Sequence, residues 1–407
     1  MAVTEQTVSL TAATIARIQE ELRARGLDGW LLYDFRGMNP VAGALLGLPA
    51  LTRRYFVLVR AEGAPVALTH RIEQGPWATW HGEKRVYSSW REMENELRSI
   101  LGGVRRLAME YTPGDAVPVV DRVPAGIIEL VRAAGVEPEG SGDLISFFTA
   151  RWSAEGEASH RRASAVVREV AHAAFARIAE AIRSGGRTDE WELRRWIQAE
   201  LAQRGLTVGG DTIVAVNANA ANAHYAPSAE QHAPIRAGDL VLIDLWGKEN
   251  DGAIYADQTW MGYVGDAVPE RLERIFGALV EAREAACALV IDRYAAGEPV
   301  AGFEVDEVSR GIIEAHGHGP QFIHRTGHSI DLELHGSGPN IDNLETRDTR
   351  TLIPGIGFSV EPGIYLEGDV GFRSEVNMFI GAAGPEVTTE RPQRRLYALL
   401  SADPFAA

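Results

Sequence analysis

Two stretches of the sequence decide its fold: LVLIDLWGKENDGAIYADQTW, residues 240–260, and FSVEPGIYLEGDVGFRSEV, residues 358–376. Each opens with an apolar strand that ends in a carboxylate, passes through a turn rich in Gly, Asn or Asp, and returns to a second carboxylate. A strand, a turn and a returning strand would set the two acids of each pair side by side. The pairs are Asp244 with Asp257 and Glu361 with Glu375.

These four carboxylates need a compensating positive charge. Burying one unpaired carboxylate costs several kcal/mol or forces it to take up a proton. Neither leading strand, 240–243 or 358–360, contains Lys or Arg. A single acid at a hairpin end is ordinarily solvated, but the duplicated pattern favours a pair of divalent cations between the acids.

A run rich in histidine separates the two stretches. Five of the 11 His residues fall between His316 and His335, and His328 follows a Thr-Gly pair. The alternation in Ile330–Leu334 predicts an extended segment that leads to His335. Imidazole and carboxylate ligands together suit zinc, cobalt or manganese. A further histidine, His224, lies upstream in the loop-like stretch NANAANAHYAPS.

This set of residues resembles the metallopeptidase family that includes methionine aminopeptidase, aminopeptidase P, prolidase and, without metal, creatinase. The flanks Gly-His at 327–328, Val-Glu-Pro-Gly at 360–363 and Arg-x-Glu at 373–375 match that family. The resemblance is strong over about residues 151–385 and loose before them. The family's ligand order of Asp, Asp, His, Glu and Glu corresponds to Asp244, Asp257, His328, Glu361 and Glu375.

The resemblance implies a fold and a cofactor. An α/β domain of the creatinase/prolidase type is expected over residues 1–150, followed by an α+β pita-bread catalytic domain over 151–407. Two divalent ions per chain, Mn²⁺, Zn²⁺ or Co²⁺, would hold a bridging water and make it hydroxide near neutral pH. By analogy Asp257 and Glu375 bridge the ions, and Glu361 also shuttles the proton.

Other residues receive roles from the same resemblance. His224 and His335 match the two histidines that stabilise the oxyanion and orient the substrate. Arg347 stands where prolidases have an arginine that binds the substrate carboxylate, with Arg350 as the competing candidate. Arg373, two residues before Glu375, is expected to hold that carboxylate. An ordinary solvated arginine or surface histidine is the plain alternative for each.

The leading functional prediction is an Xaa-Pro dipeptidase, or prolidase, that hydrolyses the imide bond before a C-terminal proline through the metal-bound hydroxide. The alternatives are aminopeptidase P acting on longer peptides and a non-peptidase enzyme on the same scaffold. The intact ligand set argues against a metal-free hydrolase of the creatinase type. It argues equally against a non-catalytic binding module, which would be expected to have lost ligands.

Composition sets the remaining limits. A chain of 407 residues favours two domains, and its net charge of −16 argues against nucleic acid or an anionic membrane as partner. A single cysteine, Cys287, excludes an internal disulfide and fits the cytoplasm. No signal peptide and no membrane span is predicted. We therefore expect a cytoplasmic enzyme with a small peptide substrate, and the resemblance implies a homodimer.

Hydrophobic periodicity predicts the secondary structure. Strands are expected over residues 29–33, 55–59, 65–68 and 106–111. Helices are expected over residues 10–26, 93–101, 125–134, 153–182, 190–204, 269–294 and 304–316.

Overall fold

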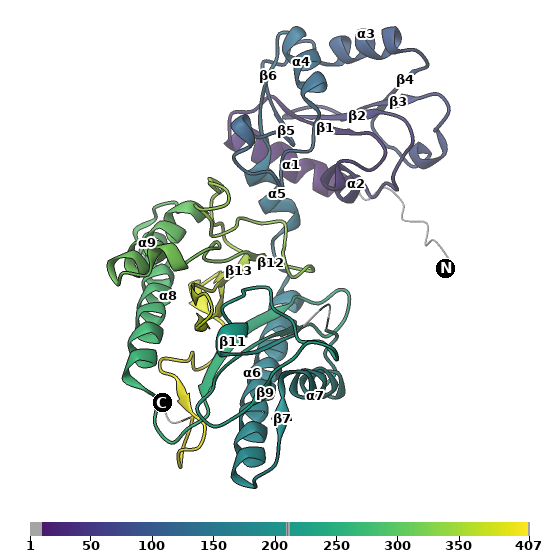
Figure 1. Cartoon of the computed structure of the whole chain (residues 1–407). Helices are drawn as coiled ribbons and strands as arrows, with labels where there is room; N and C mark the ends of the chain where they lie inside the picture. The colour runs from purple at the N-terminus through teal and green to yellow at the C-terminus, as the bar shows by residue number, and fades with distance from the viewer. Residues whose placement is uncertain (1–9, 209, 211, 406–407) are drawn as a thin grey trace. The chain divides into compact units, whose positions relative to one another are not determined.

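The computed structural model describes residues 10–208, 210 and 212–405 (Figure 1). The chain forms two compact units, of which the first ends at Thr149 and the second begins at Ala150. Within the described residues, no helix combines the length and the hydrophobicity needed to cross a membrane.

The first unit is a six-stranded sheet in the order β4-β3-β2-β1-β5-β6. Strand β2 is antiparallel to β1 and β3, whereas the pairs β3/β4, β1/β5 and β5/β6 are parallel, so β2 alone runs against the other five. The strands are β1 (Gly29–Asp34), β2 (Tyr55–Arg60), β3 (Val66–His70), β4 (Glu83–Tyr87), β5 (Arg106–Met109) and β6 (Glu137–Gly140).

Helices cover both faces of this sheet. Alternate residues of a strand point to opposite faces. Trp30 and Leu32 accordingly pack with α1, α2 and α5, while Leu31 and Tyr33 pack with α3 and α4. Burial on both faces explains why β1 is a continuous run of buried residues. The helices are α1 (Ala12–Ala24), α2 (Pro40–Leu46), α3 (Trp90–Ile100), α4 (Ala125–Ala133) and α5 (Gly142–Thr149).

The second unit is α+β. Its two four-stranded sheets have the orders β18-β11-β10-β8 and β12-β13-β16-β17, and β14-β15 and β7-β9 are separate pairs. The strands are β7 (Thr188–Asp189), β8 (Ile213–Val216), β9 (Pro234–Ile235), β10 (Leu240–Gly247), β11 (Ala256–Tyr263), β12 (Ser329–Ile330), β13 (Gly357–Val360), β14 (Gly363–Leu366), β15 (Val370–Arg373), β16 (Val376–Gly381), β17 (Gly384–Val387) and β18 (Tyr397–Ala398).

Four helices back these sheets: α6 (Ala154–Arg183), α7 (Glu190–Gln203), α8 (Glu270–Ala296) and α9 (Gly302–Ala315). Figure 1 shows α6 running along the sheet that contains β11, and the two share one apolar core. Cys287 is buried on α8, and burial raises the pKa of its thiol to about 12. A thiol with that pKa is a packing group rather than a nucleophile.

The predicted helices and strands of both units are confirmed, with ends that differ by a few residues. The extended segment predicted over Ile330–Leu334 is wrong, because β12 ends at Ile330. The carboxylate of Asp331 accepts hydrogen bonds from the N–H groups of Glu333 and Ser337, both at 2.8 Å, which turns the chain instead. Periodicity also missed short elements, which are α2, α5, β4 and β6 in the first unit and β7, β8, β9, β17 and β18 in the second.

Candidate active site

The first pair of acids lies on one hairpin. Strands β10 and β11 are antiparallel, with Asp244 opposite Thr259 and Asp257 opposite Trp246. The two acids are therefore diagonal neighbours on one face of the sheet, as the sequence predicts. Both are almost completely buried, with exposed fractions of 7% and 5%.

The second pair lies in a longer hairpin that is interrupted at the acids. Val360 in β13 pairs with Val376 in β16, and Gly363 in β14 pairs with Arg373 in β15. One register runs through both pairings and places Glu361 opposite Glu375. The expectation of one simple hairpin is thus corrected, since the strands leave one sheet and form another at this point. Glu361 and Glu375 therefore lie between strands, at the point where the hairpin passes from one sheet to the other.

His328 immediately precedes β12, and its side chain lies beside the acids. Its N–H donates to the Ser359 hydroxyl at 3.0 Å, and that hydroxyl donates to the Glu361 carboxylate, also at 3.0 Å. The imidazole Nε2 lies 3.5 Å from an oxygen of Asp257 and 3.2 Å from one of Glu361. Close strand approach requires glycine at position 327, where a Cβ would stand 2.0 Å from the Ser359 carbonyl oxygen.

The residues brought together here fit a divalent cation. Asp257, His328 and Glu375 each offer one ligand atom, and these atoms all lie within 4.8 Å of one another. One oxygen of Asp257 and one of Glu375 are buried without a hydrogen-bond partner among the described residues. Buried polar atoms ordinarily have partners, so these two orphaned oxygens are those expected of metal ligands.

Burial and mutual repulsion shift three of the four acids toward their neutral forms. Burial raises the pKa of Asp244 to about 7, opposed by Arg373 and reinforced by Asp257. Burial likewise raises the pKa values of Asp257 and Glu375 well above the usual range. At Glu361 burial is outweighed by His328 and Arg373, so its pKa is lowered. The protein's own cations therefore neutralise only part of this cluster.

Arg373 is the buried cation of the site. Its guanidinium bonds to the carboxylate of Asp244, to the Thr259 hydroxyl at 3.0 Å and to the Tyr365 hydroxyl at 3.2 Å. The Thr259 hydroxyl donates to Glu375 at 2.8 Å. Arg373 thus contacts Asp244 directly and reaches Glu375, its expected partner, only through Thr259.

Sequence reasoning missed His324 and Tyr365. Nε2 of His324 lies 2.8 Å from the Tyr365 hydroxyl, which also accepts from Arg373. Burial lowers the pKa of His324 to about 4, so the ring is neutral at pH 7. The available signal was the position of His324 in the histidine-rich run, four residues before His328.

His335 and His224 lie beside this cluster. The His335 ring meets the His328 ring edge to face, with centroids 4.4 Å apart. Burial and the neighbouring His328 lower the pKa of His335 to about 4. His224 is exposed, and the carbonyl of the preceding residue, Ala223, accepts a bond from Arg373 at 3.5 Å.

A buried carboxylate that sequence reasoning also missed fixes the loop of His224. Glu190, the first residue of α7, is completely buried. Its donors lie before, within and after the loop. They are the N–H of Val216 at 2.7 Å, the amide of Asn219 at 3.0 Å, the hydroxyl of Tyr225 at 2.6 Å and the N–H of Ala233 at 2.7 Å. One side chain thereby holds both ends and two internal points of the loop.

The two arginines considered for substrate binding are engaged elsewhere. Arg347 is exposed, and its guanidinium lies over the ring of Phe303 in α9, 4.3 Å from the centroid. Arg350 is buried in an ion pair with Asp348 at 2.6 Å. The structure therefore brings neither arginine into contact with the carboxylate cluster. The charge of another arginine, Arg325, helps to lower the pKa values of both Glu361 and His335.

Known proteins resemble this chain most clearly in the second unit. A sequence model of metallopeptidase family M24 matches residues 158–382. The Xaa-Pro dipeptidase of Lactobacillus delbrueckii subsp. lactis is 35% identical over 178 residues, 44% of each chain. A putative Xaa-Pro aminopeptidase of Mycoplasma pneumoniae is 31% identical over 191 residues, 45% of this chain and 48% of that one. Each match spans about half the length of the curated relative.

Solved structures resemble the chain over nearly its whole length. The dipeptidase PepE from Mycobacterium ulcerans has a TM-score of 0.65 at 22% identity, covering 95% of this chain and 97% of its own. A prolidase from Thermococcus sibiricus has a TM-score of 0.57 at 23% identity, covering 97% and 99%. At such identities the likeness establishes the fold, which is the predicted α/β domain followed by a pita-bread domain. Since the family model also matches more than half of the chain, the protein belongs to metallopeptidase family M24.

Proposed function

We propose that the protein is an Xaa-Pro dipeptidase that uses two divalent cations. The observation that carries the proposal is the cluster of Glu361 with three buried carboxylates and the buried His328, in which two oxygens have no hydrogen-bond partner among the described residues. Asp244, Asp257, His328, Glu361 and Glu375 would hold the ions. When bound, such ions lower the pKa of water and polarise the scissile carbonyl.

The surrounding side chains would orient the substrate and move the proton. Glu361 has a lowered pKa and bonds to Ser359, so it is ionised and fixed in place to accept a proton from water. It would return that proton to the proline nitrogen as the bond breaks. His335 and His224 would donate hydrogen bonds to the developing oxyanion. Both are assigned as histidines that touch substrate but not metal.

The test combines metal content with substrate choice. The wild type should hold about two divalent ions per chain and cleave Xaa-Pro. His335→Ala should lose turnover but retain its metal, while Asp257→Asn should lose both. A fully active preparation without metal would refute the proposal, and loss of metal from His335→Ala would refute the division of roles.

A second candidate, Xaa-Pro aminopeptidase, is favoured by one observation. The arginine expected to bind a dipeptide's carboxylate, Arg347, lies over Phe303 rather than at the acids. An enzyme without that contact would accept longer peptides. The relative from Mycoplasma pneumoniae is itself described as a putative Xaa-Pro aminopeptidase.

Competition between Ala-Pro, its C-terminal amide and Ala-Pro-Ala separates the two candidates. If Arg347 moves to bind the carboxylate, the wild type should favour the free dipeptide by about 10- to 150-fold, the contribution of a charge-assisted hydrogen bond. Arg347→Ala should abolish that preference. If Arg325 binds the carboxylate instead, Arg325→Gln should abolish it. A wild type that prefers the tripeptide supports the aminopeptidase.

A further inference from the structure

The first unit carries a pocket at the carboxyl ends of its strands. Tyr33 lies near the end of β1, and His70 and Tyr87 are the last residues of β3 and β4. Arg53 and Arg54 immediately precede β2, which runs the opposite way and so begins at this edge. Open α/β sheets bind ligands outside the carboxyl ends of their strands.

The pocket also lies where the order of the strands reverses. From β1 the chain builds β2, β3 and β4 on one side and then β5 and β6 on the other. The walls come from both sides, with Trp90 at the start of α3, after β4, and Ile127 and Leu130 on α4, after β5. The pocket thus lies between two helices that cover the same face of the sheet, beyond the carboxyl ends of its strands.

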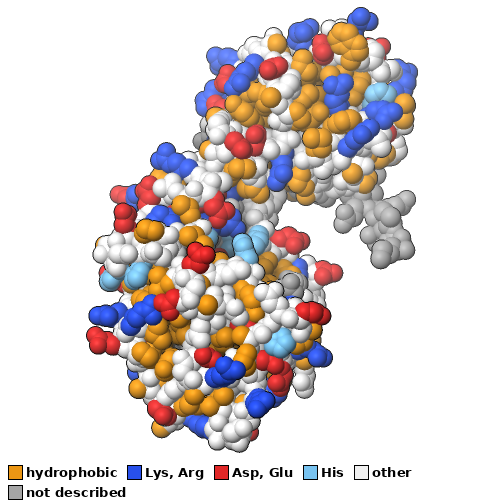
Figure 2. All heavy atoms as spheres, in the orientation of Figure 1, with side chains coloured by type: hydrophobic (Ala, Val, Ile, Leu, Met, Phe, Trp, Pro, Cys, Tyr) orange, Lys and Arg blue, Asp and Glu red, His pale blue; other side chains and the backbone are white. Residues whose placement is uncertain are grey.

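Its lining is apolar and positively charged. The residues that line the pocket include four aromatic side chains, two arginines and one histidine, and no Asp or Glu. In the whole chain acidic residues outnumber Lys and Arg by 56 to 40. Figure 2 shows basic side chains among hydrophobic ones, with fewer acidic ones, on the visible face of this unit. The volume of about 580 Å³ is in the range of small-molecule sites.

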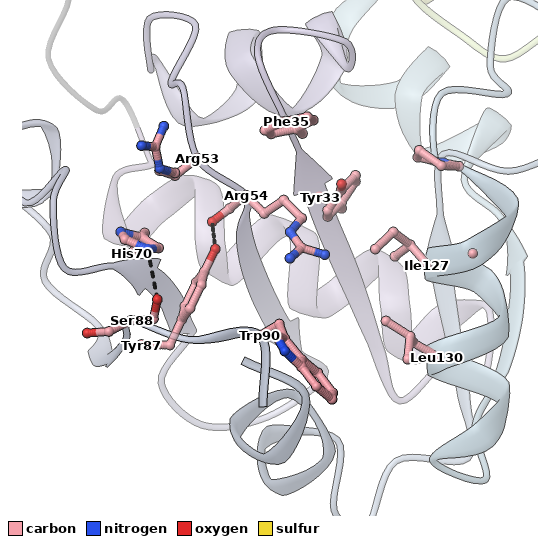
Figure 3. Close-up of a pocket in the computed structure, with 12 residues that line it drawn as sticks. Tyr33, Phe35, Arg53, Arg54, His70, Tyr87, Ser88, Trp90, Ile127 and Leu130 are labelled. Atoms are coloured by element: carbon pink, nitrogen blue, oxygen red, sulfur yellow. Dashed lines mark hydrogen bonds between the residues drawn. The ribbon is translucent and has the colours of Figure 1, made fainter. Parts of the chain in front are cut away.

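One guanidinium is available to a ligand. Figure 3 shows the side chain of Arg54 reaching into the space between Tyr33, Trp90 and Ile127. Its carbonyl accepts a hydrogen bond from the Tyr87 hydroxyl at 2.7 Å, which fixes the backbone. Burial raises the pKa of that hydroxyl and the nearby Arg54 guanidinium opposes the rise. No carboxylate lines the pocket, so this guanidinium forms no ion pair there. Arg53, at the rim, already donates to the Thr52 hydroxyl at 3.0 Å. Trp90 is 55% exposed and presents a large apolar surface.

We propose that this pocket binds an organic carboxylate with an aromatic or bulky apolar body. A guanidinium presents two parallel N–H groups that match a carboxylate. Arg54 would bind the carboxylate, and the body would lie against Trp90, Ile127 and Leu130. The carboxylate could be the C-terminus of a peptide or that of a free organic acid, since both offer the same chemistry. The lining residues all belong to the first unit and the metal cluster belongs to the second, and the proposal does not depend on the proposed peptidase activity.

The test is calorimetric titration of the full-length, metal-loaded protein with N-acetyl-L-phenylalanine and with its neutral amide. We expect one site per chain and binding of the acid in clear preference to the amide. Arg54→Gln should weaken binding about 10- to 150-fold. Arg98→Gln, an exposed arginine on α3 outside the pocket, should bind as the wild type does. Hydrolysis of Xaa-Pro should be unchanged in both variants.

Two further arms complete the experiment. Tighter binding of N-acetyl-Ala-Ala-Phe than of N-acetyl-phenylalanine identifies a peptide C-terminus as the ligand, and the reverse identifies a free acid. Trp90→Ala, at an exposed position, should also weaken binding and keeps the test valid if Arg54→Gln unfolds. The proposal is overturned if acid and amide bind equally, if Arg54→Gln binds like the wild type, or if no saturable binding occurs.

Discussion

Thr259 is the residue through which the buried arginine and the second pair of acids are joined. Its hydroxyl accepts from Arg373 and donates to Glu375. Because the hydroxyl oxygen accepts from Arg373, its proton remains free to be donated to the Glu375 carboxylate. One orientation of the hydroxyl group therefore makes both hydrogen bonds. Residues that orient metal ligands in this way tune metal affinity strongly.

We predict that Thr259→Val lowers metal affinity by about 10- to 100-fold, because the ligand loses the donor that orients it. Competition with a chelating dye measures this directly, and kcat/KM at limiting metal should fall in parallel. Thr259→Ser, which retains the hydroxyl, should restore most of both. Unchanged metal affinity in Thr259→Val would show that Glu375 is oriented by its backbone alone.

His160 is a buried histidine that the chemistry does not use. It lies on α6 between the carbonyl of Tyr255 at 2.6 Å and the hydroxyl of Thr388 at 2.7 Å. Burial lowers its pKa from 6.5 to about 4. Because the folded pKa is the lower one, the stabilisation is complete above pH 6.5 and is lost as the pH falls toward 4.

The predicted loss is on the order of 3 kcal/mol of unfolding free energy between these pH values. His160→Gln cannot take up a proton, so its stability should fall less steeply over the same window when followed by urea unfolding. His316→Gln, at an exposed position on the C-terminal end of α9, serves as the control and should follow the wild type. Parallel pH curves for wild type and His160→Gln would contradict the assignment.

At the scale of elements, the site depends on two strands that approach closely and on a loop that is fixed by hydrogen bonds to one buried carboxylate. Gly327 allows β12 to lie against β13, since a side chain there would strike the Ser359 carbonyl oxygen. Glu190 at the start of α7 holds the loop of His224. Both residues act by fixing where the backbone runs, Gly327 through a close strand approach and Glu190 through hydrogen bonds to the loop.

We predict that Glu190→Ala reduces turnover through a disordered His224 loop and destabilises the second unit by roughly 3 kcal/mol or more. The reason is that four donors lose their acceptor, and a buried unsatisfied donor costs about 1–3 kcal/mol. Steady-state kinetics and thermal unfolding measure the two effects.

Glu190→Gln retains one acceptor oxygen and should recover part of the activity, with kcat affected more than KM. Glu192→Ala is the matched control on the same helix, where the side chain pairs with Arg177 at the surface at 3.1 Å. If Glu190→Ala were as active as Glu192→Ala, the loop would not depend on this anchor.

At the scale of the whole molecule, the cluster of acids lies in the second unit. Arg373 is the buried cation of the cluster, and burial together with repulsion among the acids raises the pKa values of Asp244, Asp257 and Glu375. Bound cations would relieve this repulsion only in the folded state. Binding to the folded state alone stabilises a protein by mass action.

Calorimetry should therefore show that chelation lowers the unfolding temperature of one transition, that of the second unit. Metal at about 100 times its dissociation constant contributes about 2.7 kcal/mol. The transition of the first unit should not move. Asp257→Asn should respond to neither chelator nor added manganese. A chelator that shifted both transitions equally would contradict this division.

Much of this molecule could be predicted from local pattern. The two hairpins, the five residues in family order and the long helices all follow from short-range signals, because strand alternation, turn residues and helical periodicity act over a few residues. The register that brings Asp244 near Asp257 and Glu361 near Glu375 follows from the hairpins themselves. The α/β character of the first unit was likewise evident from alternating strands and helices.

Other features were decided only by tertiary structure. Glu190 and the Tyr225 hydroxyl lie 35 residues apart in sequence yet form a hydrogen bond, and Trp90 and Leu130 from different helices line one pocket. Arg347 had a plausible place in the sequence, yet its guanidinium stacks on Phe303. Sequence spacing by itself determined that the two acids of each pair could lie together, because each pair belongs to one hairpin with a fixed register. Only the packed chain decided where long, flexible side chains end, because a guanidinium several bonds from its backbone goes to whichever ring or carboxylate the fold places within reach.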